Sequence, residues 1–184
     1  MLGLTGVPSA LSAVPLTRRP LINIGVVDHE DELSWLREQG GDRLLVGPSG
    51  SGKTFPLYTL VLEGWGLFLV GVDPTEIAAA VRDREPGVMI VDDAHLDPER
   101  LVELRRLRDE TGAEFSIVAT AWKGEVDPVI ETLGISGSKV RELKLLERDE
   151  IVRVVEESGV PGPLWLVRDI VDQAEGKPGL AVTL

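Results

Sequence analysis

Short apolar runs alternate with helix-like stretches through the middle of the chain. The runs that predict strands cover 43–46, 67–72, 88–91, 115–119 and 140–146. Helical periodicity lies between them, and Asp73-Pro74-Thr75-Glu76 is typical of a helix start, with a capping side chain, a first-turn proline and a capping-box glutamate. Strands that alternate with helices form right-handed βαβ units. We therefore expect an α/β fold in which a five-stranded parallel sheet lies between two layers of helices.

The two ends of the chain differ from this central pattern. Residues 1–20 are rich in Pro, Gly, Ser and Thr, which predicts a flexible N-terminal arm. Residues 21–146 carry the alternating strands and helices of the core. From Glu147 only helical stripes follow, so 147–184 are expected to form a small helical lid subdomain. The chain stops inside an apolar run that begins at Leu180, and we interpret this run as the start of a missing module of a longer protein.

Composition and charge remove several classes of function. The 184 residues suffice for one domain with a small appendage. No cysteine is present, which excludes disulfides, cysteine-bound zinc, iron–sulfur clusters and thiol catalysis. A net charge of −12 disfavours binding to nucleic acid or to an anionic membrane surface. The sequence has neither a signal-peptide pattern nor an apolar stretch of membrane-spanning length, so we expect a cytoplasmic protein.

A glycine-rich loop follows the first predicted core strand. Its sequence fits G-x-x-x-x-G-K-[ST], the phosphate-binding pattern, and it stands between a strand and a helix as that pattern requires. Glycines allow successive N–H groups to face an anion, and the helix N-terminus adds its positive end. Lys53 would neutralise the β- and γ-phosphates, and the Thr54 hydroxyl would bind Mg²⁺. The alternative is a strand–helix turn with an incidental lysine. The residues expected to hold nucleotide here are Gly47, Pro48, Ser49, Gly50, Ser51, Gly52, Lys53, Thr54 and Phe55.

Two carboxylates stand at the end of the buried run 88–91. Ligands of open α/β sheets bind at the carboxyl ends of the strands. Beside a phosphate loop, Asp92 is expected to hold Mg²⁺, directly or through water, and Asp93 to orient or deprotonate the attacking water. The alternative is a solvated strand-to-helix turn with an aspartate cap.

Three further residues near these strand ends could take part. Thr120, at the end of the following strand, is a candidate sensor of the γ-phosphate, or a threonine that satisfies the backbone at the strand end. We expect His95 to lie on a surface turn, and Trp122 to serve packing or an interface.

A phosphate loop, an apolar strand ending in two aspartates, a polar-tipped strand and a helical lid together resemble the STAND branch of the AAA+ P-loop ATPases. The resemblance runs from about residue 22 to the last residue. Gly176-Lys177-Pro178, after the lid helices, looks like the family's G-x-P motif. In that family the proline lies against the nucleotide and a winged helix follows, which implies a nucleotide contact for Pro178. The implied fold is a P-loop NTPase three-layer sandwich followed by a small helical lid.

The N-terminal segment of the resemblance covers 26–33. In the family this segment lies near adenine, which implies nucleotide contacts for Val26 and Val27. Two positions depart from the pattern: Asp28-His29 replaces the usual Gly-Arg pair, and Ala121-Trp122 stands where many members carry an arginine.

STAND proteins are switches, in which ADP holds a closed monomer and exchange for ATP permits assembly. The resemblance therefore implies an ATP- and ADP-binding, Mg²⁺-dependent regulatory module that controls assembly of a larger signalling protein, by self-association or through a neighbouring domain. Lys53, Asp93 and Thr120 would carry the chemistry. The next arginine after Thr120 is Arg141, so we expect slow hydrolysis in isolation.

Two other functions compete with this hypothesis. One is a stand-alone P-loop kinase or other phosphotransferase, and the other is a nucleotide-binding scaffold without hydrolysis. A kinase usually has an arginine-rich lid, whereas the lid here holds only Arg148, Arg153 and Arg168.

Overall fold

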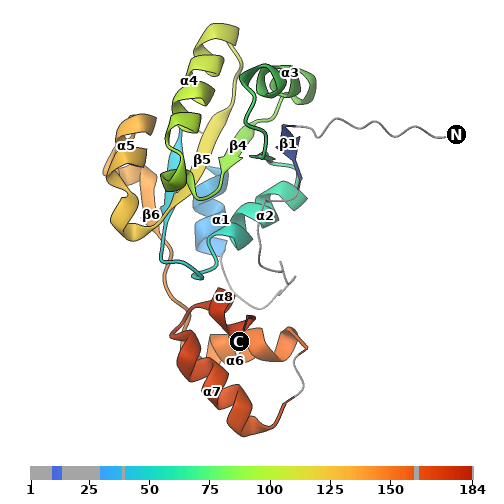
Figure 1. Ribbon diagram of the computed structural model, residues 1–184, viewed down its shortest axis with the longest axis vertical. Coiled ribbons are helices and arrows are strands. Elements are labelled where there is room, and N and C mark those ends of the chain that lie inside the picture. Colours follow the sequence, from blue (N-terminus) through green and yellow to red (C-terminus); the bar gives the residue numbers. More distant parts are fainter. Residues whose placement is uncertain (1–9, 14–29, 39, 160–161, 184) are drawn as a thin grey trace, which may run out of the picture.

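A six-stranded sheet forms the centre of the protein (Figure 1). The computed structural model describes residues 10–13, 30–38, 40–159 and 162–183. The strand order is β1-β3-β4-β5-β2-β6, and every neighbouring pair except β1–β3 is parallel. The strands are β1 (Leu11–Ser12), β2 (Arg43–Val46), β3 (Leu67–Leu69), β4 (Val88–Val91), β5 (Ser116–Ala121) and β6 (Val140–Glu142).

The expected count of five strands was wrong by one, because β1 was not predicted. This strand has two residues and pairs antiparallel with β3 at the sheet edge. A strand so short shows no alternation of apolar and polar positions, and it lies in a stretch rich in proline and glycine. The Ala10 carbonyl accepts the N–H groups of Val70 and Gly71, which fastens the segment to the end of β3.

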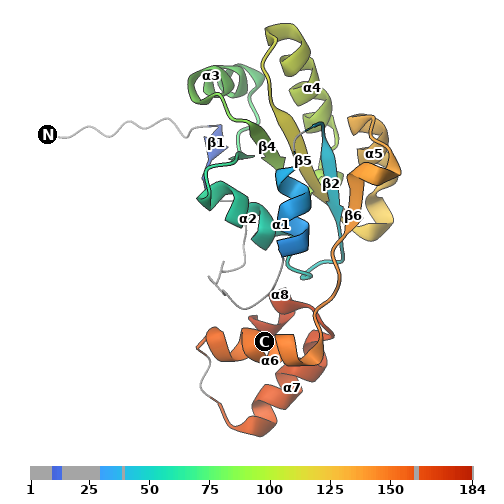
Figure 2. The same cartoon turned by 180° about the vertical axis from the view of Figure 1, so that it is seen from behind.

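Helices cover both faces of the sheet, which confirms the three-layer arrangement. On one face lie α3 (Pro74–Arg84), α4 (Glu99–Thr111) and α5 (Asp127–Leu133); on the other lie α1 (Glu30–Arg37) and α2 (Thr54–Leu62) (Figures 1 and 2). Side chains of adjacent strand residues point to opposite faces of the sheet. Leu44 therefore packs with the first group of helices and Leu45 with the second. The expected start of α3 is confirmed, because the Asp73 side chain accepts the N–H groups of Thr75 and Glu76.

The C-terminal helices form a unit with an apolar core of its own. This unit, called the lid below, comprises α6 (Arg148–Glu157), α7 (Leu164–Ala174) and α8 (Pro178–Ala181). Figure 1 shows the lid beyond the end of the sheet at which the loop after β2 lies. Ala181, in the apolar run that ends the chain, is buried in the lid core. None of the helices in the described ranges has the length and apolar character needed to cross a bilayer.

Candidate functional site

The loop between β2 and α2 encloses its own lysine. Gly50 and Gly52 have φ angles of 82° and 94°, in the left-handed region that glycine tolerates best. The buried Lys53 ammonium donates to the carbonyls of Gly47 and Pro48, at 2.9 and 3.1 Å. The lysine charge is thus held inside the curve of the loop, where an anionic ligand would meet it.

One buried hydroxyl of the loop is left without a partner. Ser51 is fully buried, and its Oγ makes no hydrogen bond within the described structure. An unpaired buried hydroxyl costs about 1–3 kcal/mol and indicates a missing polar partner. The loop is also too tight for a side chain at Gly47, where an added Cβ would lie 2.7 Å from that Ser51 oxygen. The loop therefore fits a phosphate group.

The carboxylate of Asp92 joins the loop to the neighbouring strands. Its Oδ2 accepts the Thr54 hydroxyl at 2.8 Å, and its Oδ1 accepts the Thr120 hydroxyl at 2.6 Å. A hydroxyl and a carboxylate at this distance are a fitting pair of Mg²⁺ ligands, since Mg²⁺ takes few protein ligands and completes its shell with water and phosphate oxygens. No cluster of three or more His, Cys, Asp or Glu suited to a metal occurs in the described ranges. A cation here would therefore depend on Thr54, Asp92 and the ligand itself.

Asp93 occupies a strained backbone position directly after Asp92. Its φ of 50° and ψ of 43° are left-handed, which a non-glycine residue adopts at a cost of about 1–3 kcal/mol. Its N–H donates to the Thr120 hydroxyl at 2.8 Å and to Asp92 Oδ1 at 3.2 Å. These two acceptors hold the turn, which leads into the short 3₁₀ helix η1 (Ala94–Leu96).

Thr120 therefore sits between the two acids. Because β5 lies between β2 and β4, this fully buried residue reaches from the loop side of the sheet to the acidic strand end. Its hydroxyl donates a hydrogen bond to Asp92 Oδ1, and the hydroxyl oxygen accepts a hydrogen bond from the N–H of Asp93. Both sequence-based alternatives involved polar contacts at this strand end; in the structure those contacts go to the acids and their backbone.

The lid contacts the glycine-rich loop directly. The N–H of Gly179 donates to the Gly50 carbonyl at 2.8 Å, and an added Cβ on Gly52 would lie 3.2 Å from Pro178 Cγ. Pro178, expected to contact nucleotide, thus lies against the loop expected to bind phosphate. Val26 and Val27, expected near adenine, lie outside the described residues.

Comparison with known proteins finds the same fold among solved structures. No protein-family model matches the sequence, and no curated protein matches it either. Among solved structures, Cdc6p from Pyrobaculum aerophilum superposes with a TM-score of 0.62 at 19% identity, over 92% of this chain and 62% of that one. The fold is that of a P-loop ATPase.

Two further solved structures, of other AAA+ P-loop ATPases, share this fold. A katanin structure that addresses self-assembly gives a TM-score of 0.56 at 20% identity, over 87% of this chain and 66% of that one. The RuvB Holliday junction branch migration motor of Thermotoga maritima gives 0.56 at 20%, over 84% and 58%. The chain thus spans less than two thirds of the length of each neighbour.

Sequence reasoning missed the environment of His95 at this end of the P-loop ATPase fold. His95 lies in the turn η1 and is partly exposed, but its imidazole packs against the Trp122 ring, with centroids 4.6 Å apart. Both ring nitrogens are buried without a hydrogen-bond partner. Burial lowers the pKa of His95 below its ordinary value, and nearby Lys53 lowers it further, against the opposing effect of Asp93. The only sequence signal was the position of His95, two residues after the acid pair.

Arg141 of β6 contacts α1. Its guanidinium lies over the Trp35 ring at 5.2 Å and donates to the Asp31 carbonyl, so it fastens β6 to α1. The guanidinium of Arg43 also lies over the Trp35 ring, 5.7 Å from the ring centroid.

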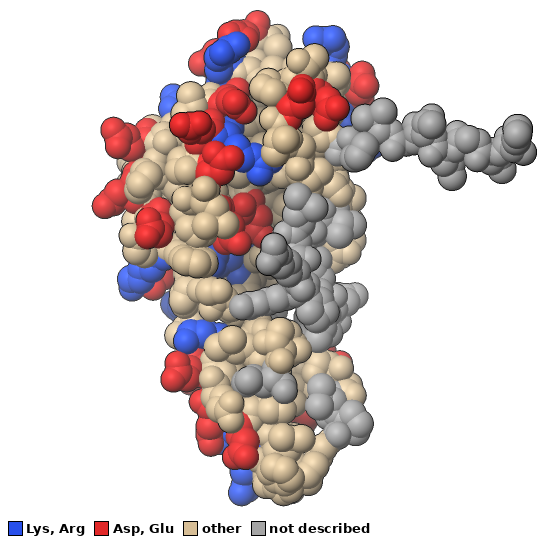
Figure 3. Space-filling model, in the orientation of Figure 1, with Lys and Arg blue, Asp and Glu red and all other residues tan. Residues whose placement is uncertain are grey.

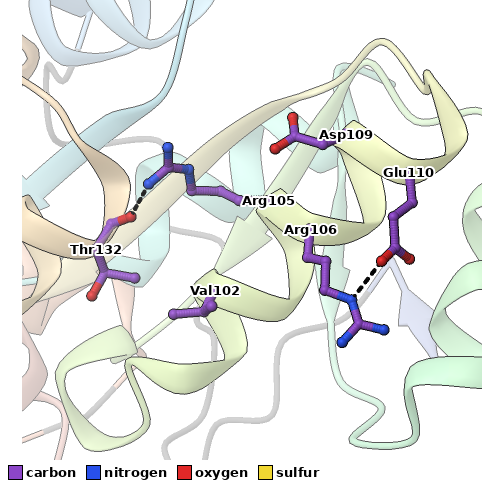
Figure 4. A pocket seen from close by; sticks show the side chains of 6 residues that line it. All are labelled: Val102, Arg105, Arg106, Asp109, Glu110 and Thr132. Atoms are coloured by element: carbon purple, nitrogen blue, oxygen red, sulfur yellow. Dashed lines mark hydrogen bonds and ion pairs between the residues drawn. The ribbon is translucent and has the colours of Figure 1, made fainter.

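A surface hollow of about 410 Å³ lies elsewhere, beside α4 and α5 (Figure 4). Both arginines that line it are engaged, since Arg105 donates to the Thr132 carbonyl and Arg106 pairs with Glu110. None of the residues of the glycine-rich loop or of the acid pair belongs to its lining. Its lining consists of Val102, Arg105, Arg106, Asp109, Glu110 and Thr132.

Proposed function

We propose that this chain is the ATP-binding, slowly hydrolysing domain of a STAND-type regulatory switch, whose nucleotide state controls assembly of a larger signalling protein. The observation that carries the proposal is the placement of the Thr54 hydroxyl 2.8 Å from the Asp92 carboxylate, directly after a lysine held inside the loop. This combination provides a phosphate cradle, a cationic side chain and a pair of Mg²⁺ ligands at one strand end.

The residues of the chain have separate tasks in hydrolysis. Lys53 exchanges its two carbonyl acceptors for the β- and γ-phosphate oxygens, while Thr54 and Asp92 hold Mg²⁺. Bound Mg²⁺ supplies neutralisation of the negative charge on the phosphates. Asp93 accepts a proton from water as the water oxygen bonds to the γ-phosphorus. The bond from that phosphorus to the bridging oxygen breaks, which yields ADP and inorganic phosphate.

The contact between lid and loop supports the regulatory part of the proposal. Gly50 and Gly52 belong to the loop that would take the phosphates, and Gly179 and Pro178 of the lid rest on them. A change in the loop on nucleotide exchange therefore reaches the lid directly. The engagement of Arg141 with Trp35 and Asp31 of α1 agrees with slow hydrolysis, since the charge needed at the γ-phosphate would come from another subunit or domain. Self-association is one way to bring it, and one structural neighbour is described for its self-assembly.

Phosphate release from Mg²⁺-ATP by three proteins tests the proposal. In Asp93→Asn, ATP affinity should stay within about twofold of the parent while hydrolysis falls about 100-fold or more, because the proton acceptor is lost and the metal ligands remain. In Asp92→Asn, a titration of ATP with and without Mg²⁺ should show that the dependence of ATP binding on Mg²⁺ is weakened. Parental hydrolysis rates in both variants would contradict the assignment of these acids. Phosphoryl transfer to an added acceptor in preference to water would favour a phosphotransferase instead.

A further inference from the structure

The imidazole of His95 is the polar group at this site whose burial the machinery above leaves unexplained. Both of its nitrogens are enclosed and lack a partner within the described structure. A buried polar atom without a partner destabilises a fold, and such atoms call for a specific explanation. A neutral imidazole carries one N–H donor and one acceptor nitrogen, so two hydrogen bonds are forgone here.

The ring is held in place by elements that also carry the site. His95 lies in η1, which begins at Asp93, and the Leu96 N–H donates to the Asp93 carbonyl at 3.0 Å. Trp122, whose ring lies against the imidazole at an interplanar angle of 41°, follows Thr120 by two residues at the end of β5. The imidazole is therefore fixed by the same two strand ends that position Asp92, Asp93 and Thr120.

The charges that act on His95 are those of the same site. After burial, the groups that influence the pKa of His95 are Asp93, then Lys53, Glu125 and Asp92. Burial keeps the imidazole neutral, so it can offer an N–H without bringing a positive charge of its own. The Asp93 carboxylate belongs to the same turn, two residues before His95, and it can receive several hydrogen bonds at once.

We propose that His95 is a positioning residue for ATP hydrolysis: with nucleotide bound, its N–H donates to the Asp93 carboxylate and holds that carboxylate toward the attacking water. This inference rests on the proposed function. The imidazole proton stays on His95, and the proton released by the water still passes to Asp93. The two nitrogens that lack a partner in the structure are then explained by a hydrogen bond that forms only when nucleotide binds.

The first test replaces the imidazole by a ring that keeps its shape. His95→Phe retains packing against Trp122 but removes both nitrogens. Without nucleotide, this variant should melt about 2–4 °C above the parent, because two unpaired polar atoms leave the interior. Its kcat should fall at least about tenfold, with KM and calorimetric ATP affinity within about twofold of the parent. His95→Gln, which restores an N–H donor, should recover part of kcat. Leu96→Ala, an exposed change in the same turn, is the matched control for both measurements.

The second test asks whether His95 acts through Asp93. The double variant His95→Phe/Asp93→Asn should hydrolyse ATP no more slowly than Asp93→Asn alone, within about twofold. A parental kcat in His95→Phe, a lower melting temperature, or fully additive losses in the double variant would each overturn the inference. Failure of the proposed function is distinguishable, because the unsubstituted protein would then neither bind nor hydrolyse ATP.

Discussion

Thr120 shows how one buried hydroxyl can organise several functional groups. It donates to Asp92 and accepts from the N–H of Asp93, and these contacts hold the left-handed turn at Asp93. A residue that only sensed phosphate would need a hydroxyl free to donate to it, whereas the Thr120 hydroxyl already donates a hydrogen bond to the Asp92 carboxylate. The structure therefore favours a role for Thr120 in shaping the acid pair before any ligand binds.

We predict that Thr120→Val lowers the free energy of unfolding by about 1–3 kcal/mol, because the isosteric valine leaves a partly buried carboxylate oxygen of Asp92 and the backbone N–H of Asp93 with fewer partners. Urea denaturation without nucleotide measures this directly. Thr120→Ser keeps the hydroxyl and serves as the control. If Thr120→Val were as stable as the parent and impaired only in hydrolysis, a role confined to the phosphate would be the better account.

At the scale of elements, the turn before α8 packs closely against the segment that leads into the lid. Gly176 has a φ of 75°, and an added Cβ would lie 2.8 Å from the Leu146 carbonyl oxygen. Its own carbonyl accepts the Leu146 N–H at 2.9 Å, so this turn closes against the segment that leads into the lid. Gly159, after α6, has a similar φ of 71° but nothing within 4 Å of an added Cβ.

Substitution of these two glycines by alanine distinguishes the cost of a left-handed backbone from the cost of a steric clash, because only Gly176 has atoms close to an added Cβ. Gly159→Ala should destabilise the lid by about 1–2 kcal/mol, the cost of a left-handed residue with a Cβ. Gly176→Ala should cost about 1–3 kcal/mol more, because its methyl group meets backbone atoms that cannot move aside easily. Hydrogen exchange of α6 and α7 amides measures both effects. Equal protection of these amides in the two variants would show that the close approach at Gly176 does not matter.

The strands buried on both faces were the elements most open to prediction. β2 and β4 begin and end as expected, since continuous apolar runs bounded by polar or glycine residues leave little choice of limits. The run expected over 67–72 ends earlier, at Leu69, because Val70 and Gly71 bond to Ala10. The strand expected over 140–146 ends at Glu142, where the chain departs toward the lid.

The site was predictable in its residue types and less so in its contacts. The phosphate pattern and the paired aspartates mark residues that lie close together, as the hydrogen bond between Thr54 and Asp92 shows. The partners of Thr120 and the enclosure of His95 depend on β5 lying between β2 and β4. Strand order is a long-range property that no local pattern encodes.

At the scale of the whole molecule, two packed units meet at the glycine-rich loop. The sheet and its helices form one, the lid has a separate apolar core, and Gly179 and Pro178 of the lid contact the loop. Charge is spread over both, and Figure 3 shows basic side chains scattered among acidic ones on the visible face. With a net charge of −12, the enclosed Lys53 is a local exception to a repulsive field for anions.

Calorimetric titration of Mg²⁺-ATP into the protein and its Lys53→Ala variant tests the central claim most directly. The parent should bind one nucleotide, whereas the variant should remain folded and lose at least about 100-fold in affinity, because the charge enclosed by the loop is gone. Circular dichroism confirms folding of the variant before the titration. Equal affinity in the two folded proteins, or no binding to the parent, would contradict the account of this loop as a nucleotide site.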